Sequence, residues 1–158
     1  MGKTIESIAS FGRMVRILKD TIETQVEALA QDCGCTAKTP MLSPILLLAE
    51  DGALTAADIA RRLDDSHQLT TQRINWLIQN KYAKTGPNKE DGRSRSVALT
   101  AKGKKEAAKV VQLAAKLEQA YQSLFAELES DLLKHCRQAV RSLIALPLRE
   151  RVESEEPS

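Results

Sequence analysis

Apolar residues near the N-terminus recur at the spacing of a helix that packs against another helix, and they predict one long helix over residues 4–31. The apolar seam of this helix consists of Ile8, Phe11, Val15, Leu18, Ile22 and Leu29, with Gln25 at the remaining position. The seam extends over about three heptads, which suffices to pair with a partner helix but is short for a free-standing coiled coil. Gly34 and Pro40 then break the chain.

A short apolar helix is expected after this break. Ser43 suits its N-cap and Pro44 its first helical position, and Asp51-Gly52 ends it.

Residues 55–80 then predict a helix-turn-helix. Thr55 is expected to cap a helix over residues 56–63, with Asp58 in a capping-box position. Asp64-Asp65 interrupts that helix, and Ser66 is expected to cap a second one that extends to about residue 80.

A β-hairpin and two further helices are expected downstream. Residues 82–85 and 96–99 are candidate strands, joined by a turn with basic residues. Thr100 is expected to open a helix that reaches about residue 128, and a last helix covers residues 131–146. The remaining residues, 149–158, are charged and lack apolar anchors, so we expect a disordered tail.

The charge distribution adds a candidate partner to this picture. The net charge of +2 is too small to indicate nucleic acid by itself. Residues 81–109, however, hold nine Lys or Arg residues against three acids, a local excess of six positive charges. Positive charge is therefore concentrated on the hairpin and the start of the next helix, where DNA phosphates would be met.

Composition and motifs argue against several other classes of protein. The N-terminus shows no secretory signal, and no apolar run is long enough to span a membrane. Three cysteines do not make a disulfide framework, so a reducing cytoplasm is the expected compartment. No Gly-rich phosphate loop, nucleophile elbow or paired-carboxylate site is present, so we expect neither an enzyme nor a cofactor.

The run from Leu54 to Gly103 resembles the MarR family of bacterial transcription regulators. The helix-turn-helix pattern of the family matches Leu54-Thr55, Ile59-Ala60 and Ser66. Its wing pattern, Asp-x-Arg followed by a strand and Leu-Thr-x-x-Gly, matches Asp91, Arg93, Leu99-Thr100 and Gly103. One long helix before this run and two after it also look like the family.

Three departures from the family pattern lie in or near the recognition helix. Asp64 and Lys81 stand where the family often has Gly. Asp enters the left-handed region at modest cost but Lys less readily, so we expect the second turn to be built differently. Gln72-Arg73 replaces a common Thr-Arg pair, which implies a different operator sequence.

The second helix of the helix-turn-helix is the candidate for reading DNA bases. Helical spacing directs Thr70, Ile74, Leu77 and Ile78 to the core. The opposite, polar face consists of Ser66, His67, Gln68, Thr71, Gln72 and Asn75. Gln68 and Gln72 carry the amide that can pair with adenine in the major groove, and Arg73 suits either guanine or a phosphate. A merely solvated polar helix face is the alternative reading.

The wing supplies the second candidate contact. Arg93 and Arg95 alternate with Ser94, so on a strand they share one side of the hairpin. A narrow A·T-rich minor groove attracts inserted arginines, and Asp91 is placed to hold the Arg93 guanidinium and support the wing. The alternative is a pair of solvated turn arginines.

The cysteines allow a further hypothesis. Cys33 and Cys35 end the first helix and Cys136 follows His135 in the last one. Thiols near a dimer interface can act as an oxidation switch or, with His135, bind a metal. Incidental small residues are the alternative, and the one-residue spacing of Cys33 and Cys35 suits a metal poorly, so we expect no metal site.

The predicted fold is mainly α (α+β), a winged helix-turn-helix between dimerisation helices. Its expected parts are an N-terminal dimerisation helix (1–40), a DNA-binding lobe (41–100), C-terminal dimerisation helices (101–148) and the tail (149–158). The resemblance implies a homodimeric repressor that binds a pseudo-palindromic operator in double-stranded DNA and responds to a small aromatic or anionic effector. The alternatives are a winged-helix module that binds a protein partner and a DNA binder without an effector.

Overall fold

In a computed structural model, the chain is described over residues 8–87 and 95–155. It divides into two compact units, Met1–Leu117 and Glu118–Ser158, which are described separately. The DNA-binding lobe expected at residues 41–100 lies within the first unit.

The first unit begins with the predicted long helix. A short 3₁₀ turn, η2 (Ile8–Ser10), leads into α1 (Phe11–Asp32), so the α-helix starts later than the apolar pattern indicates. Residues 4–7, with which we expected it to begin, lie outside the described part of the chain. Gly34, at a φ of +70°, turns the chain away after the helix ends.

The start of the next helix corrects one prediction. The 3₁₀ turn η3 (Thr39–Met41) runs directly into α2 (Leu42–Asp51), so Ser43 is not the N-cap and Pro44 is the third helical residue. Pro44 is tolerated there because the first four N–H groups of a helix have no partner within the helix. Gly52 ends α2 as predicted, at a φ of +81°.

The helix-turn-helix has the predicted boundaries. Helix α3 (Ala56–Leu63) is capped by Thr55, whose hydroxyl accepts from the Asp58 N–H at 3.1 Å. Helix α4 (His67–Gln79) is capped by Ser66, which accepts from the Leu69 N–H at 3.2 Å.

Both unusual turn residues adopt the left-handed conformation. Asp64 has a φ of 55° and Lys81 a φ of 64°. The expectation that the second turn is built differently because of Lys81 is therefore wrong. The turn keeps the glycine conformation, and Lys81 accepts the steric cost of its Cβ.

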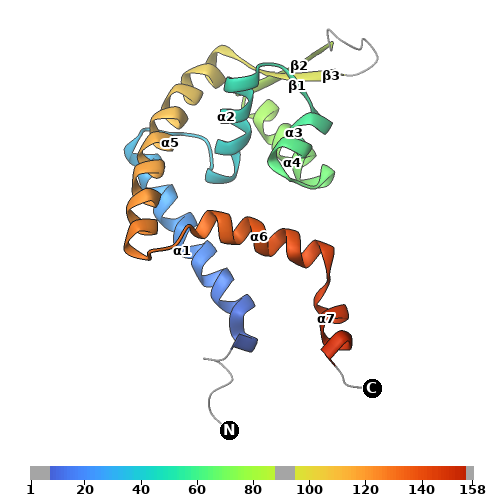
Figure 1. The fold of residues 1–158 in the computed structure, drawn as a ribbon. Helices are drawn as coiled ribbons and strands as arrows, with labels where there is room; N and C mark the ends of the chain where they lie inside the picture. The colour runs from blue at the N-terminus through green and yellow to red at the C-terminus, as the bar shows by residue number, and fades with distance from the viewer. Residues whose placement is uncertain (1–7, 88–94, 156–158) are drawn as a thin grey trace. The chain divides into compact units, whose positions relative to one another are not determined.

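The wing forms a small antiparallel sheet of β1 (Leu54–Thr55), β2 (Ala83–Pro87) and β3 (Arg95–Leu99) in the order β1-β3-β2. Sequence periodicity missed β1 because two residues cannot show an alternation. Helices α2, α3 and α4 lie beneath this sheet in the view of Figure 1. Their fully buried side chains, together with one from α5, form the centre of the core: Ile45, Ile59, Leu77 and Leu113.

Helix α5 (Ala101–Glu127) begins in the first unit and continues into the second. Thr100 caps it, accepting from the Gly103 N–H at 3.1 Å. A Cβ at position 103 would overlap the carbonyl oxygen of Tyr82. The glycine of the Leu-Thr-x-x-Gly motif therefore allows α5 to lie directly against the end of the preceding turn.

The second unit continues with α6 (Leu132–Ala145) and α7 (Leu148–Glu155). Helix α7 is a correction, because we expected disorder from residue 149 onward. Local contacts stabilise it: Arg149 pairs with Glu153 at 3.0 Å, and Arg151 donates to the carbonyls of Leu146 and Ser142. None of the helices within residues 8–87 and 95–155 is long and apolar enough to cross a membrane.

Candidate nucleic-acid interface

Helix α4 presents one buried and one exposed face. Thr70, Ile74 and Leu77 are buried, as helical spacing predicts. The exposed residues of the N-cap and the helix are Ser66, His67, Gln68, Leu69, Thr71, Gln72, Asn75 and Gln79. All six polar residues predicted to face DNA therefore lie on the exposed face, with Gln68 and Gln72 one helical turn apart.

Arg73 stands apart from this face. Its guanidinium forms an ion pair with Asp65, and the side chains of the two residues are 20% and 12% exposed. The pair ties the turn after α3 to the middle of α4. In the described structure the Arg73 guanidinium holds the recognition helix to this turn, and its contact with DNA remains a prediction.

The described part of the wing carries one of its two predicted arginines. Arg95 is exposed and donates to the Thr85 hydroxyl across the hairpin at 2.8 Å. This bond orients the guanidinium at the base of the hairpin tip. Asp91 and Arg93 lie outside the described residues, so their roles remain predictions.

Among the described basic residues between 81 and 109, two bond to backbone carbonyls of other segments. Lys102 donates to the Asn80 carbonyl at 2.9 Å and lies 4.1 Å from the centre of the Tyr82 ring. Lys109 donates to the Gly34 carbonyl at 2.6 Å. The exposed basic residues among those described in this stretch are Lys81, Lys84, Arg95, Lys102, Lys104 and Lys105. The described part of the stretch therefore presents most of its positive charge to solvent.

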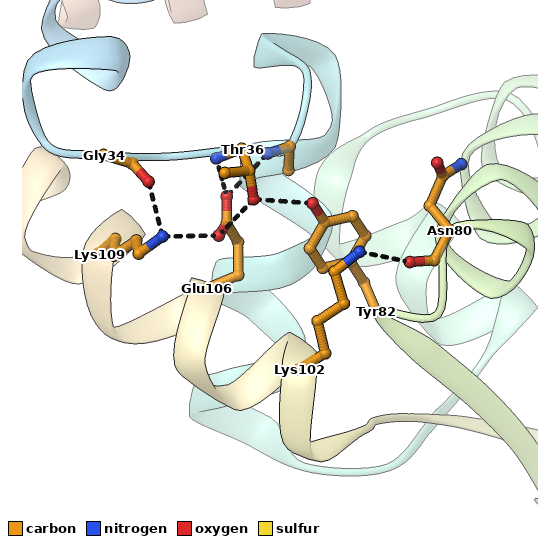
Figure 2. Close-up of polar contacts among 8 residues, drawn as sticks. Gly34, Thr36, Asn80, Tyr82, Lys102, Glu106 and Lys109 are labelled. Atoms are coloured by element: carbon orange, nitrogen blue, oxygen red, sulfur yellow. Dashed lines mark hydrogen bonds and ion pairs between the residues drawn. The ribbon is translucent and has the colours of Figure 1, made fainter.

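A buried polar network behind the recognition helix was not predicted. The carboxylate of Glu106, whose residue is 3% exposed, accepts from the backbone N–H groups of Thr36 and Ala37 at 2.5 and 2.7 Å (Figure 2). The Thr36 hydroxyl lies 3.0 Å from this carboxylate and 2.9 Å from the hydroxyl of Tyr82. Sequence reasoning counted Glu106 only as one local acid. A lone acid at a position where α5 otherwise buries small apolar residues was the available signal.

Burial alone would raise the pKa of the Glu106 carboxyl group. The hydrogen bonds from Ala37 and Thr36 and the nearby Lys109 ammonium outweigh burial and hold this pKa below its ordinary value. Glu106 is therefore ionised at neutral pH. An ionised carboxylate only accepts hydrogen bonds, so the Thr36 hydroxyl donates to Glu106 and the Tyr82 hydroxyl donates to Thr36.

The three cysteines differ in burial. Cys33 and Cys35 are half-buried and Cys136 is exposed. Burial, with the negative charge of Glu106, raises the pKa of the Cys35 thiol, which disfavours the reactive thiolate. The His135 ring lies 3.2 Å from the Ser130 hydroxyl. Among the described residues, no three His, Cys, Asp or Glu side chains cluster closely enough to hold a metal ion.

No protein-family model and no curated protein sequence matches this chain. Solved structures do share its fold. The MarR family transcription regulator SP03579 superposes with a TM-score of 0.57 at 17% identity, over 99% of this chain and 100% of that one. The heme sensor PefR from Streptococcus agalactiae, in complex with heme, has a TM-score of 0.57 at 18% identity, over 87% and 95% of the two chains.

A variant of ZitR from Lactococcus lactis has a TM-score of 0.53 at 23% identity, over 70% of this chain and 74% of that one. At such identities the likeness is one of fold. It confirms the resemblance inferred from the helix-turn-helix and wing motifs at that level. This chain has the winged-helix fold found in a MarR family transcription regulator, mainly α with a small antiparallel sheet.

Proposed function

We propose that this chain is a transcriptional regulator of the MarR type that binds double-stranded DNA as a homodimer. The observation that carries the proposal is the exposed polar face of α4, capped by Ser66 and followed by a hairpin with exposed basic residues. A helix of this kind fits the major groove, and a basic hairpin beside it meets the phosphates and the neighbouring minor groove.

The recognition helix and the hairpin differ in what their side chains can contact on DNA. Gln68 and Gln72 each carry an amide that can donate to and accept from one adenine edge. His67 lies at the N-terminal end of the helix, where side chains reach base edges. Arg95 and the exposed lysines of the hairpin and α5 contribute attraction to phosphates, which does not depend on sequence.

A dimer is supported by the apolar surface of α1. The exposed large apolar side chains of η2 and α1 are Ile8, Phe11, Met14, Val15, Ile17 and Leu18, with exposures of 95%, 63%, 55%, 47%, 38% and 41%. An exposed apolar stripe of this extent is typical of an interaction surface. Its heptad seam suits packing against the same helix of a second copy of the chain. A twofold dimer would offer two recognition helices to half-sites about 34 Å apart.

The proposal includes a small-molecule effector. One structural neighbour is described as a heme sensor, so small-molecule response occurs on this fold. For this chain we propose a small aromatic or anionic ligand whose binding lowers operator affinity and so relieves repression in the cytoplasm. Such a ligand acts only if it prefers one arrangement of the dimer over another.

Two measurements test DNA binding. The purified protein is mixed with a random duplex library, and the retained fragments are sequenced. The affinity of an enriched duplex is then measured at several salt concentrations. We expect an enriched pseudo-palindrome and a steep fall of log affinity with log salt. No enrichment and no salt dependence would instead favour the protein-interaction module.

A further inference from the structure

The network of Glu106, Thr36 and Tyr82 joins segments that are far apart in sequence and that serve different parts of the proposed regulator. Thr36 lies in the loop that follows the seam helix α1, Glu106 lies on α5, and Tyr82 follows the recognition helix α4 (Figure 2). All three lie in the first compact unit. These contacts therefore tie the loop after α1 to both α5 and the residue that follows α4.

Tyr82 holds the C-terminal end of the recognition helix in place through backbone hydrogen bonds and contacts of its ring. Its N–H donates to the Leu77 carbonyl at 2.8 Å, closing the last turn of α4. Its carbonyl accepts from the Thr100 N–H at 2.9 Å, at the start of α5. Its ring stacks on Trp76 of α4 with centroids 5.7 Å apart, and Lys102 covers the ring.

The Tyr82 hydroxyl connects the C-terminal end of α4 to the loop after α1. It reaches the Thr36 hydroxyl at 2.9 Å, and Thr36 is in turn held by Glu106 through both its N–H and its hydroxyl. Since Glu106 fixes the donor direction along the chain, removing the Thr36 hydroxyl leaves the hydroxyl of the buried Tyr82 without the acceptor that the structure gives it.

We propose that Glu106 and Thr36 are positioning residues for DNA binding, coupling the loop after α1 to the C-terminal end of the recognition helix through the Tyr82 hydroxyl. This inference rests on the proposed function for its DNA readout but not for its structural readout. Through these contacts, a rearrangement at the seam helix α1 would change the position of α4.

The test uses Thr36→Val and Tyr82→Phe, singly and together. Each removes a hydroxyl with little change in volume, and Tyr82→Phe keeps the ring that stacks on Trp76. Ile45→Val is the matched control, because Ile45 is fully buried in the same unit but takes no part in the network. All variants are measured in the full chain, well below their melting temperatures.

The first readout needs no DNA. Hydrogen exchange of the Lys81, Tyr82 and Thr100 amides should accelerate several-fold in Thr36→Val, and not in Ile45→Val. The Thr36 change lies outside α4 and α5, so acceleration at these amides supports coupling. Unchanged exchange at the end of α4 would overturn the inference, whether or not the protein binds DNA.

The second readout is affinity for the enriched duplex. Thr36→Val and Tyr82→Phe should each weaken it by about 3- to 10-fold, and the double variant no more than the stronger single change, since each single change already removes the Thr36–Tyr82 bond. Ile45→Val should have a lower melting temperature than the wild type but the same affinity for the duplex. Equal affinities in all folded variants would mean that the network only stabilises the fold. A wild-type chain that enriches no duplex would refute the proposed function, and the exchange data would then decide the coupling alone.

Discussion

At the scale of single residues, a buried carboxylate organises the region behind the recognition helix. Glu106 accepts two backbone N–H groups and one hydroxyl, so its burial is compensated by hydrogen bonds rather than by a single ion pair. Lys109 lies 3.4 Å away and contributes a weaker attraction. The stability of this arrangement therefore depends on the charge state of one group.

That dependence gives a pH prediction. The pKa of Glu106 lies below its ordinary value of 4.5, so the stability that the carboxylate contributes is present above that pH and is lost as pH falls through the lowered pKa. Glu106→Gln should cost about 1–3 kcal/mol of unfolding free energy near neutral pH, because the amide cannot accept from every donor.

Thermal melts of the wild type and Glu106→Gln from neutral pH down to acid pH check this. The difference in melting temperature between the two proteins should shrink as the pH falls below the ordinary value. A constant difference across the whole range would show that the charge of Glu106 contributes nothing.

The cysteines give a second prediction at this scale. The raised pKa of Cys35 keeps its thiol protonated at neutral pH, and a protonated thiol reacts slowly with peroxide. Mild peroxide should therefore change DNA affinity equally in the wild type and in a variant with Cys33, Cys35 and Cys136 all replaced by Ser. Loss of affinity in the wild type alone would restore the oxidation switch.

At the scale of elements, several residues with a strong local preference were predicted correctly, although Ser43 does not cap its helix. Thr55 and Ser66 cap their helices because a hydroxyl before a helix satisfies a free N–H whatever the rest of the fold does. Asp64 and Gly52 end helices through their tolerance of positive φ. The polar face of α4 followed from helical periodicity, since a core on one side leaves the other exposed.

Elements that depend on distant partners were missed. Strand β1 exists because Leu54 and Thr55 pair with Val97 and Ser96 of β3, more than 40 residues away, and nothing local marks it. The Glu106 network depends in the same way on a loop 70 residues away. The ion pair of Arg73 with Asp65 was likewise not predicted, because it requires the geometry of the turn.

Packing of α5 against the end of the α4 turn gives the element-scale prediction. Gly103→Ala would place a methyl group on the Tyr82 carbonyl, and the backbone must shift to accommodate it, at a cost of about 1–3 kcal/mol. Gly12→Ala is the control, because a Cβ at that position of α1 meets nothing within 4 Å. Chemical denaturation should show Gly103→Ala destabilised and Gly12→Ala unchanged or stabilised, and equal stability of the two variants would contradict the close approach.

At the scale of the whole molecule, the proposed regulator consists of two copies of the chain. Leu18 lies on the seam of α1 and is 41% exposed within one chain, so a charge there need not disturb the fold of a protomer. Leu18→Asp should convert a dimer to a folded monomer and weaken binding to a palindromic duplex by at least about tenfold, since the two half-sites no longer act together. Sedimentation and circular dichroism check this, and a variant that remains dimeric would show that the seam is not the interface.

The proposed division of roles is that α4 reads bases while the wing supplies attraction to the DNA backbone. It is tested most directly by titrating the enriched duplex and its single-base variants at two salt concentrations, with the wild type, Gln72→Ala and Arg95→Ala. Gln72→Ala should lose about 1–3 kcal/mol of discrimination at one symmetric position per half-site and keep its salt dependence. Arg95→Ala should weaken every duplex and reduce the salt slope by about one unit, if Arg95 displaces one counterion. If neither variant changes affinity, discrimination or salt slope, this surface does not bind DNA.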